Sequence, residues 1–402
     1  MKIENTPIDL FWTDAMEERM MADEHERELR MLVAAGGTGG HIFPAIAVVE
    51  QLQQMLGDAL NVEFIGSEDR MEATMIPQLG YPYTSMPITG FKGMMDPSTI
   101  TLPFKVLKSE RIARDVIKRF KPHVVLVTGA YMSYPAGMAA YKERIPLVLM
   151  ESNVNPGKTN ARLSTYANAI ILAFEESRDH FGDTQQDHLF VRGNPVRTQI
   201  KTDGDQRTAR STFGLQEERP TVFVFGGSLG ARSLNQAVQD RVERWAATKA
   251  TPDYQILWQT GKNFSATIPA DIASHVVAHP FINDMGSAFA AADVVVCRSG
   301  ATTIAELGIV GKPAILIPLP SASTNEQRLN AEVVERRGGA IVIKDDDVSA
   351  TLMDTVQALL VDPSRRERMR EAMLTIGKPD AASEAARIVL MAAGRVKKEV
   401  EA

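Results

Sequence analysis

The sequence predicts an α/β protein with two doubly wound parallel-sheet (Rossmann-like) domains that face each other across a cleft. Three observations support this prediction. The chain has 402 residues, which is too long for one ordinary hydrophobic core. Short apolar runs alternate with helical patterns in two successive series, as in parallel sheets covered by helices. Each series opens with an apolar run, a glycine loop and a helix.

The first series extends from Leu29 to about Asn194. It opens with a predicted strand at residues 31–35, a glycine loop at 36–40, and a helix from His41 to Leu52. Further strands are predicted at residues 62–66, 124–129, 146–150 and 169–173. Because parallel strands place their carboxyl ends at one edge of a sheet, we expect the ligand of this domain at that edge.

The second series predicts strands at residues 221–225, 255–258, 276–278, 294–297, 314–318 and 340–343. The polar stretch 197–220 separates the two series and reads as a linker with a first short helix. We therefore expect four segments: an acidic mobile arm at 1–28, a first domain at 29–195, a second domain at 196–375, and a C-terminal helical segment at 376–402 that packs back on the first domain. The ligand would bind in the cleft between the domains.

Composition excludes several classes of protein. The chain is 44% hydrophobic and 23% charged, which is typical of a globular protein. A formal net charge of −6 gives no indication of nucleic-acid binding. The single cysteine, Cys297, ends an apolar run, so we expect a buried thiol in a reducing compartment. Neither a long apolar run nor a basic leader occurs, so we expect no membrane span, no signal peptide and a cytoplasmic protein.

The first glycine loop, Gly36–Gly40, is suited to an oxygen-rich ligand, because amides at the start of a helix are donors at the positive end of its dipole. Its spacing is neither the dinucleotide G-x-G-x-x-G nor a nucleoside-triphosphate P-loop. His41 follows in the first helical turn, where the dipole favours a neutral ring that can accept a proton. The alternative is a helix-start histidine that only bonds a backbone carbonyl.

Three further loops carry polar chemistry. Residues 226–234 repeat the strand, glycine loop and helix, with the Ser228 hydroxyl as an added donor, although a plain tight turn would look the same. Glu306 lies two turns into the helix after Arg298, where a carboxylate can accept both hydroxyls of a ribose diol; solvation of a surface helix is the alternative. Residues 321–330 offer amides and a carboxylate to a polyol such as a sugar.

These loops, in this order, resemble the MurG family, the UDP-N-acetylglucosamine transferases that add the second sugar to the undecaprenyl-linked peptidoglycan precursor. They are two-domain GT-B glycosyltransferases of family 28. The resemblance covers Leu29 to about Ala393 and rests on six motifs: residues 36–41 (GGTGGH), 129–135 (GAYMSYP), 193–197 (GNPVR), 226–232 (GGSLGAR), Arg298-Ser299-Gly300 with Glu306, and Asn325-Glu326-Gln327 with Asn330-Ala331.

The resemblance implies roles for matching positions. The UDP-GlcNAc donor would be held by Arg197, Ser228, the main chain at Ile282, Arg298, Glu306, Glu326, Gln327 and Asn330. In this family Glu306 would bind the ribose, Ser228 the diphosphate and Ile282 the uracil. The acceptor would be faced by Thr38, Gly39, Gly40, Tyr131, Ser133 and Asn153.

His41 is the implied general base, which takes the proton from the acceptor 4-hydroxyl as it attacks the anomeric carbon with inversion. UDP would leave against the Ser228 loop, so neither a metal nor a cofactor is expected. Departures from the family pattern are Met150, Ser152, Leu229 and Glu326. Residues 345–347 (DDD) read as a solvated turn away from the site loops rather than as a metal-binding D-x-D.

A lipid acceptor implies that the first domain touches the inner membrane surface, so we expect a peripheral protein on the cytoplasmic face of the cell membrane. Residues 102–121 support this, because a basic amphipathic helix suits an anionic leaflet. They hold seven basic residues against Glu110 and Asp115, interleaved with Phe104, Leu107, Ile112 and Val116. Phe91, Met94 and Met95 would add insertion area. Part of the helix would also pack on the sheet.

The expected partners are UDP-GlcNAc, the undecaprenyl-linked MurNAc-peptide and the membrane surface, with other cell-wall enzymes as further candidates and no nucleic acid. The expected activity is a UDP-GlcNAc-dependent hexosyl transfer in peptidoglycan synthesis, with roles in cell shape and cell division. Two alternatives stand beside it. One is an inverting GT-B transferase with another lipid acceptor, and the other is a UDP-sugar-binding protein without catalysis.

Overall fold

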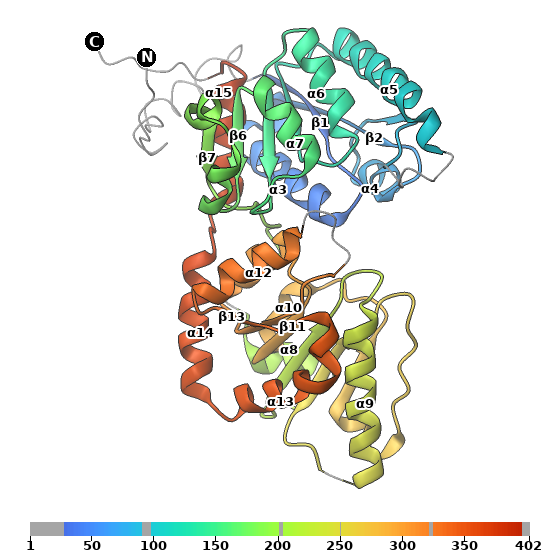
Figure 1. The fold of residues 1–402 in the computed structure, drawn as a ribbon, viewed down its shortest axis with the longest axis vertical. Coiled ribbons are helices and arrows are strands. Elements are labelled where there is room, and N and C mark those ends of the chain that lie inside the picture. Colours follow the sequence, from blue (N-terminus) through green and yellow to red (C-terminus); the bar gives the residue numbers. More distant parts are fainter. Residues whose placement is uncertain (1–27, 91–97, 201–203, 250, 321–324, 396–402) are drawn as a thin grey trace, which may run out of the picture. The chain divides into compact units, whose positions relative to one another are not determined.

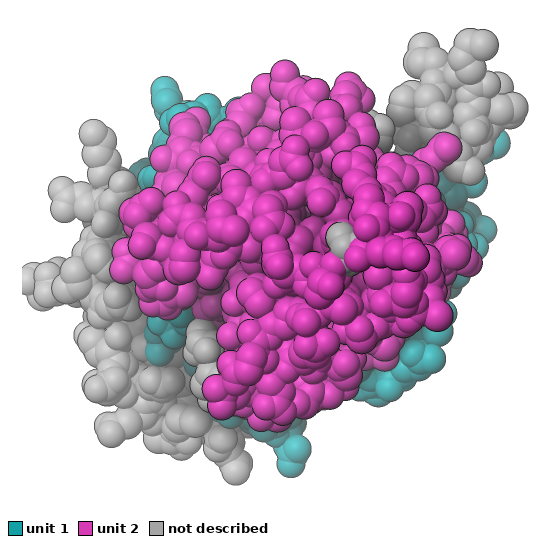
Figure 2. Space-filling view, turned by 90° about the horizontal axis from the view of Figure 1, so that it is seen from below, with its two compact units in different colours: residues 1–197, 379–402 teal, residues 198–378 magenta. Residues whose placement is uncertain are grey.

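The computed structural model describes residues 28–90, 98–200, 204–249, 251–320 and 325–395. The chain forms two compact units, one of residues 1–197 and 379–402 and the other of residues 198–378 (Figure 2). The last part of the chain therefore belongs to the same unit as the first part. The units are described separately below, as unit 1 and unit 2.

Unit 1 is built on a seven-stranded, entirely parallel sheet with the order β3-β2-β1-β4-β5-β6-β7 (Figure 1). The strands are β1 (Leu29–Ala34), β2 (Leu60–Ser67), β3 (Tyr83–Met86), β4 (Val124–Val127), β5 (Leu147–Glu151), β6 (Ala169–Leu172) and β7 (Leu189–Val191). The order reverses direction at β1, because β2 and β4 pair with its two sides. The carboxyl ends beside β1 are therefore where a ligand of a doubly wound sheet is expected.

Helices cover both faces of this sheet. The α-helices of unit 1 are α3 (Gly39–Leu56), α4 (Met71–Gln78), α5 (Ser98–Phe120), α6 (Ser133–Lys142), α7 (Lys158–Leu163) and α15 (Ala381–Ala392). Short 3-10 helices lie at Gly57–Ala59, Ser164–Tyr166, Glu175–His180 and Asp183–His188. α3 and α15 lie on one face, and α5 and α6 lie on the other.

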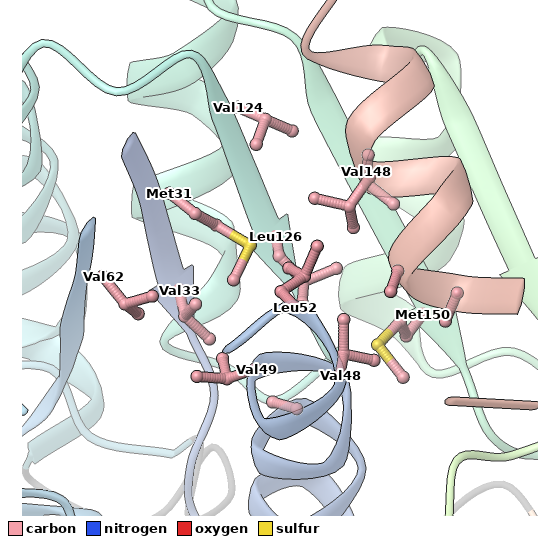
Figure 3. Close-up of a cluster of buried hydrophobic side chains, with 14 of the residues drawn as sticks. Met31, Val33, Val48, Val49, Leu52, Val62, Val124, Leu126, Val148 and Met150 are labelled. Atoms are coloured by element: carbon pink, nitrogen blue, oxygen red, sulfur yellow. The ribbon is translucent and has the colours of Figure 1, made fainter. Parts of the chain in front are cut away.

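The alternation of side-chain direction along each strand explains why both faces of the sheet are apolar. Met31 and Val33 of β1 join a cluster with the buried side of α3, including Val48, Val49 and Leu52 (Figure 3). Leu32 and Ala34 of the same strand join the opposite cluster with α5 and α6. Since successive strand residues point to opposite faces, a nearly continuous apolar run is what a strand covered on both sides requires.

Unit 2 has a six-stranded parallel sheet with the order β10-β9-β8-β11-β12-β13. Its strands are β8 (Thr221–Phe225), β9 (Gln255–Gln259), β10 (Val276–His279), β11 (Val294–Cys297), β12 (Ala314–Leu316) and β13 (Ala340–Val342). Its α-helices are α8 (Gln206–Thr212), α9 (Arg232–Thr248), α10 (Met285–Ala291), α11 (Ala301–Val310), α12 (Glu326–Arg336), α13 (Val348–Leu360) and α14 (Pro363–Ile376), with 3-10 turns at Ala270–His275 and Asp345–Asp347.

One face of this second sheet packs against α9 and α13. On the other, Phe223 and Phe225 of β8 contact Phe289 of α10, with ring centroids 5.8 and 6.0 Å apart. The order reverses at β8, which pairs with β9 and β11, so the loops after these strands meet at one edge.

The prediction of two doubly wound parallel sheets is confirmed, and all six strands of the second series are observed. The first series missed β3 and β7, which are short edge strands with mixed burial and lack the apolar run of a central strand. The first helix begins at Gly39, two residues before the predicted start.

Some predictions fall outside the described residues: those for the arm up to residue 27, for Phe91, Met94 and Met95, and for part of the 321–330 loop. Within the described ranges, no helix combines the length and apolar character that crossing a bilayer requires.

Candidate active site

The first glycine loop connects β1 to α3 at the carboxyl edge of the unit 1 sheet. Gly37 has a φ of 83°, a left-handed conformation that glycine adopts without strain. Thr38 is the N-cap of α3, and its carbonyl accepts from the amides of His41 and Ile42 at 3.1 and 3.2 Å. Thr38 and Gly40 are exposed while Gly39 and His41 are half-buried, so the outer side of this turn is accessible within unit 1.

His41 is tied to the neighbouring strand. Its Nδ1 lies 2.7 Å from the carbonyl oxygen of Thr128, the residue that follows β4. Because a carbonyl can only accept, Nδ1 carries the proton, and in the neutral ring the lone pair is on Nε2. The ring therefore has the tautomer that a base acting through Nε2 requires. This geometry is compatible with both interpretations of His41, the general base and the helix-start histidine that bonds a backbone carbonyl.

A buried carboxylate, Glu72, lies beneath the glycine loop and was missed in the sequence. Its side chain is 0% exposed and accepts from the Gly37 amide at 2.9 Å, the Ser67 amide at 3.2 Å and the Ser67 hydroxyl. A Cβ on Gly36 would lie 2.4 Å from Glu72 Cδ, so the loop needs glycine there to admit the carboxylate. The Gly37 amide is consequently bound within the protein.

The turn after β4 reaches the same loop. The Tyr131 ring lies beside Gly37 and Gly90, where added Cβ atoms would be 3.8 and 3.4 Å from it. Ser133 is completely buried, donates to the Ala34 carbonyl at 3.2 Å and accepts from the Gly129 amide at 3.2 Å. Tyr131 thus borders the glycine loop, whereas Ser133 fastens this turn to β1.

A second buried carboxylate, Glu151, organises the loop after β5. It accepts from the amides of Asn153 and Gly157 at 2.9 and 3.0 Å and from the side chain of Asn160 at 2.9 Å. Burial raises the pKa of Glu151, and these hydrogen bonds oppose that shift. Asn153 is therefore held by backbone and side chain at the same carboxyl edge. Ser152, a departure from the family pattern, donates to Asn194 at 3.0 Å.

Arg197 is the last residue of the first of the two chain segments that form unit 1. Its guanidinium carbon lies 4.2 Å from the centre of the Phe43 ring of α3, which is a cation–π geometry. Burial raises the pKa of Glu50 on the same helix, and the charge of Arg197 opposes that shift. The donor contact expected of Arg197 stays a prediction.

In unit 2 the second glycine loop joins β8 to α9. Gly227 and Gly230 have φ angles of 89° and 83°, and Ser228 and Leu229 between them are exposed. A Cβ on Gly230 would lie 2.2 Å from the Thr260 carbonyl oxygen, so the loop packs closely on the end of β9. The exposed Ser228 hydroxyl sits where an anion cradle before a helix would need it.

Ile282 lies in the loop between β10 and α10. Its side chain is buried, and its amide donates to Gln259 Oε1 at 2.8 Å. Gln259, at the end of β9, also donates from Nε2 to the Gly227 carbonyl at 3.2 Å. The sequence analysis missed this residue, although a glutamine directly after the apolar run 256–258 is a signal that could have indicated it.

Arg298 follows β11 and joins several loops of unit 2. Its Nη1 forms an ion pair with Asp345 and donates to the carbonyls of Ile317 and Pro318, both at 3.2 Å. Ser233 of α9 donates to the same Asp345 carboxylate at 2.6 Å. The expectation of a solvated turn at 345–347 is wrong for Asp345, because this carboxylate pairs with a site residue; Asp346 and Asp347 are exposed.

Glu306 is buried on α11, within the second turn after Arg298. Cys297 ends β11 nearby, and burial, followed by the charge of Glu306, raises the pKa of its thiol. Cys297 is therefore a buried, protonated thiol.

The start of α12 is joined to its neighbours by two residues of the helix, Gln327 and Asn330. Gln327 accepts from the Leu319 amide at 3.0 Å through Oε1, and its own carbonyl accepts from Ser299 Oγ at 2.8 Å. Asn330 is completely buried and donates to the Ser299 carbonyl at 3.5 Å. Glu326, which begins α12, is half-buried. Asn330 thus contacts the backbone beside Arg298 from inside the unit.

Each unit thus gathers its predicted residues at the carboxyl edge of its own sheet. Unit 1 offers a histidine with an oriented lone pair and an accessible glycine turn; unit 2 offers a hydroxyl-bearing glycine loop and a buried carboxylate. Such parts suit proton removal in unit 1 and binding of a phosphate- and diol-bearing ligand in unit 2. Among the described residues, no three histidine, cysteine or acidic side chains gather as a metal site would require.

Comparison with known proteins identifies the class. The model of the glycosyltransferase family 28 N-terminal domain matches residues 31–172, and that of the glycosyltransferase family 28 C-terminal domain matches residues 221–385. Together with the two doubly wound sheets, these matches define a family 28 glycosyltransferase of GT-B fold.

Full-length relatives define the family more closely. An enzyme of Prosthecochloris aestuarii is 39% identical over 363 residues, 88% of this chain and 96% of that protein. One of Porphyromonas gingivalis is 35% identical over 380 residues, 92% of this chain and 98% of that protein. The chain belongs to the family that both represent, the UDP-N-acetylglucosamine–N-acetylmuramyl-(pentapeptide) pyrophosphoryl-undecaprenol N-acetylglucosamine transferases. The resemblance stated from the motifs is confirmed.

Solved structures agree with this family. The crystal structure of Acinetobacter baumannii MurG superposes with a TM-score of 0.68 at 28% identity, and covers 90% of this chain and 99% of its own. The calicheamicin glycosyltransferase CalG4 has a TM-score of 0.65 at only 16% identity and covers 92% of this chain and 99% of its own, so it supports the fold alone.

Proposed function

We propose that this enzyme transfers GlcNAc from UDP-GlcNAc to the 4-hydroxyl of MurNAc in an undecaprenyl-pyrophosphoryl-MurNAc-peptide, with inversion at the anomeric carbon. The product is the disaccharide lipid precursor of peptidoglycan. Membership of the transferase family supports the reaction. The observation that carries the mechanism is the 2.7 Å contact from His41 Nδ1 to Thr128, because it leaves the lone pair of a neutral ring on Nε2.

On the acceptor side, Nε2 of His41 removes the proton of the 4-hydroxyl as this oxygen attacks the sugar. The exposed side of the turn at Thr38, Gly39 and Gly40 contacts the acceptor diphosphate at the start of α3, where the helix dipole favours an anion. Tyr131, beside this loop, and Asn153, held by Glu151, border the muramyl sugar.

On the donor side, Glu306 accepts from the ribose hydroxyls, and Ser228 with its loop binds the diphosphate. The charge that develops on the departing UDP is stabilised by the Ser228 hydroxyl and the amides of its loop. The main chain at Ile282 reads uracil, and Glu326 and Gln327 contact the GlcNAc hydroxyls. Arg197 adds a contact to the nucleotide. Arg298 and Asn330 contribute to the donor site by positioning its loops, through their hydrogen bonds to the carbonyls of Ile317 and Ser299.

The same proposal places the enzyme at the cytoplasmic face of the membrane, through α5. Phe104 and Leu107 are 74% and 64% exposed, and Lys108 and Arg111 are exposed on the same side of this helix. Ile112 and Val116 instead pack toward the sheet. Apolar side chains beside exposed basic ones suit the interface of an anionic leaflet. Other cell-wall enzymes are further candidate partners of this protein. The same reaction gives it roles in cell shape and cell division under this proposal.

The test is transfer of labelled GlcNAc from UDP-GlcNAc to a short-chain lipid-linked MurNAc-peptide by the full chain. We expect a disaccharide product with a β-linkage to the 4-hydroxyl. A wild-type protein that binds UDP-GlcNAc but gives no product with any muramyl acceptor would contradict this reaction. Parallel reactions with a diacylglycerol acceptor test the alternative of another lipid acceptor, which transfer to that lipid would support. Binding of UDP-GlcNAc without transfer to either acceptor would support the non-catalytic alternative.

A further inference from the structure

Gln259 joins two loops that are far apart in sequence. It is the last residue of β9, where it pairs with Phe225 of β8 on one side and His279 of β10 on the other. The loop after β8 carries Ser228 and the loop after β10 carries Ile282. Gln259 therefore occupies the strand position between the two loops that contact the nucleotide in the proposed function.

The side-chain amide of Gln259 uses both of its ends. Oε1 accepts from the Ile282 amide at 2.8 Å, and Nε2 donates to the Gly227 carbonyl at 3.2 Å. The side chain is only 3% exposed, so these contacts lie away from water, where an unsatisfied polar group is costly. Only a group with a donor and an acceptor at this spacing satisfies both loops.

The backbone around Gln259 leaves the loops little freedom. The Thr260 amide donates to the His279 carbonyl at 2.9 Å, and the Gly261 amide donates to the Pro280 carbonyl at 3.1 Å. On the other side, a Cβ on Gly261 would lie 2.1 Å from the amide nitrogen of Gly230. The segment after β9 is thus packed between both loops, and the Gln259 side chain is hydrogen-bonded to each of them.

Unit 1 has a corresponding arrangement at its own glycine loop. Gly37 and Gly227 are each the second glycine of their loops, with φ of 83° and 89°. Each glycine is hydrogen-bonded by a buried polar side chain. The Gly37 amide donates to Glu72 of α4, the helix after β2, and the Gly227 carbonyl accepts from Gln259 of β9. β2 and β9 are neighbours of β1 and β8 in their sheets. Two units with different sequences fix the same loop position, which indicates that the position of this glycine matters to each site.

We infer that Gln259 is a positioning residue for UDP, which holds the phosphate-binding loop at Gly227 and the uracil-binding main chain at Ile282 in one arrangement. The inference rests on the proposed function, because that function assigns the two loops to the nucleotide. Gln259 itself touches the loops, and it acts on the ligand through them.

The chain offers a matched control on the same strand. Gln255, at the amino end of β9, is also buried and bonds backbone and side chains of residues 216, 219 and 221. Replacing either glutamine by leucine removes a buried amide from β9, but only Gln259 contacts the loops at the carboxyl edge. A merely structural contribution would therefore appear equally in both variants.

The experiment measures UDP binding by titration calorimetry and thermal unfolding for the full-length wild type, Gln259→Leu and Gln255→Leu. We expect Gln259→Leu to weaken UDP at least about tenfold, since two buried hydrogen bonds are lost. Gln255→Leu should lose stability and bind UDP like the wild type. UDP affinity unchanged in Gln259→Leu, or weakened equally in Gln255→Leu, overturns the inference.

A second variant covers the case in which Gln259→Leu does not fold. Gln259→Glu keeps an acceptor for the Ile282 amide but turns a carboxylate toward the Gly227 carbonyl. UDP should therefore weaken more than uridine, and affinity relative to wild type should recover at acidic pH as the carboxyl gains a proton. Equal weakening of UDP and uridine without recovery overturns the inference. If the wild type binds no UDP, the proposed function falls first, and the inference with it.

Discussion

His41 and Thr128 are joined by a 2.7 Å contact between the imidazole Nδ1 and the carbonyl oxygen that follows β4. The two residues are 87 positions apart in the chain, and they meet because β1 and β4 are neighbours in the sheet. The contact fixes the ring's tautomer and leaves the lone pair on Nε2, as a base requires, but a helix-start histidine would make the same contact.

His41→Asn separates these two roles, because an asparagine amide can still donate to the Thr128 carbonyl but offers no base. We expect kcat for transfer to fall about a hundredfold or more, with UDP affinity and thermal stability near those of the wild type. Steady-state transfer assays with UDP titrations check this. Transfer within a few-fold of wild type would show that His41 only caps the turn.

Glu72→Gln introduces an NH2 group among the donors from Gly37 and Ser67. We expect the free energy of unfolding to fall by about 1–3 kcal/mol, as for an unsatisfied buried group. The KM for the acceptor should rise while UDP affinity in unit 2 is unchanged.

Glu63→Gln is the matched control for Glu72, since Glu63 is also buried in unit 1 but bonds Thr84 and Arg119 rather than a loop. Denaturant unfolding and acceptor kinetics of both variants provide the comparison. The same acceptor KM in both would leave Glu72 with a stabilising role alone.

Asp345→Asn removes the charge that pairs with Arg298. This pair is largely buried, so we expect a loss of about 1–3 kcal/mol in unfolding free energy, a lower melting temperature and weaker UDP binding. The exposed neighbour Asp346 supplies the control, because Asp346→Asn should change none of these three quantities. Equal melting temperatures for the two variants would show that the Arg298 pair contributes nothing measurable.

His123 predicts a pH dependence of stability. Burial, followed by the charges of Arg395 and Arg30, lowers its pKa from 6.5 to about 4, while Glu28 opposes the shift. The unfolded chain therefore binds a proton before the native protein does, and stability falls as the pH drops from about 6.5 to about 4. The ring is partly solvated, so we expect this contribution to be about 1 kcal/mol.

The measurement for His123 is urea unfolding across that pH range for the wild type and His123→Asn, in which Asn can still accept from the Arg30 amide. The variant should lose less stability on acidification than the wild type. Parallel pH profiles would mean that His123 titrates alike in the native and unfolded states.

Phe104→Ser combined with Leu107→Ser should weaken binding to vesicles of anionic phospholipid by about tenfold or more, because two exposed apolar side chains are lost. Val361→Ser is the control: Val361 is 70% exposed on unit 2, outside α5. Sedimentation with vesicles at low and high salt separates the apolar contribution to membrane binding from the electrostatic one. Equal binding by the double variant and the control would exclude α5 as the membrane contact.

The sequence by itself determined the fold class and the positions of the site loops. Periodicity and glycine placement are local properties, so the runs at 221–225 and 294–297 and the loops at 36–40 and 226–230 could be predicted without neighbours. The edge strands Tyr83–Met86 and Leu189–Val191 could not, since pairing with one neighbour demands no apolar run.

Only the tertiary structure decided which side chains act behind those loops. Glu72, Gln259 and Asp345 look like a helical glutamate, a strand-end glutamine and a turn aspartate, and each acquires its partner from a segment distant in sequence. A parallel sheet brings the ends of non-consecutive strands to one edge, and a linear pattern holds no record of which polar groups then meet. The same reason applies to His41: its presence was read from the sequence, and its tautomer was set by Thr128.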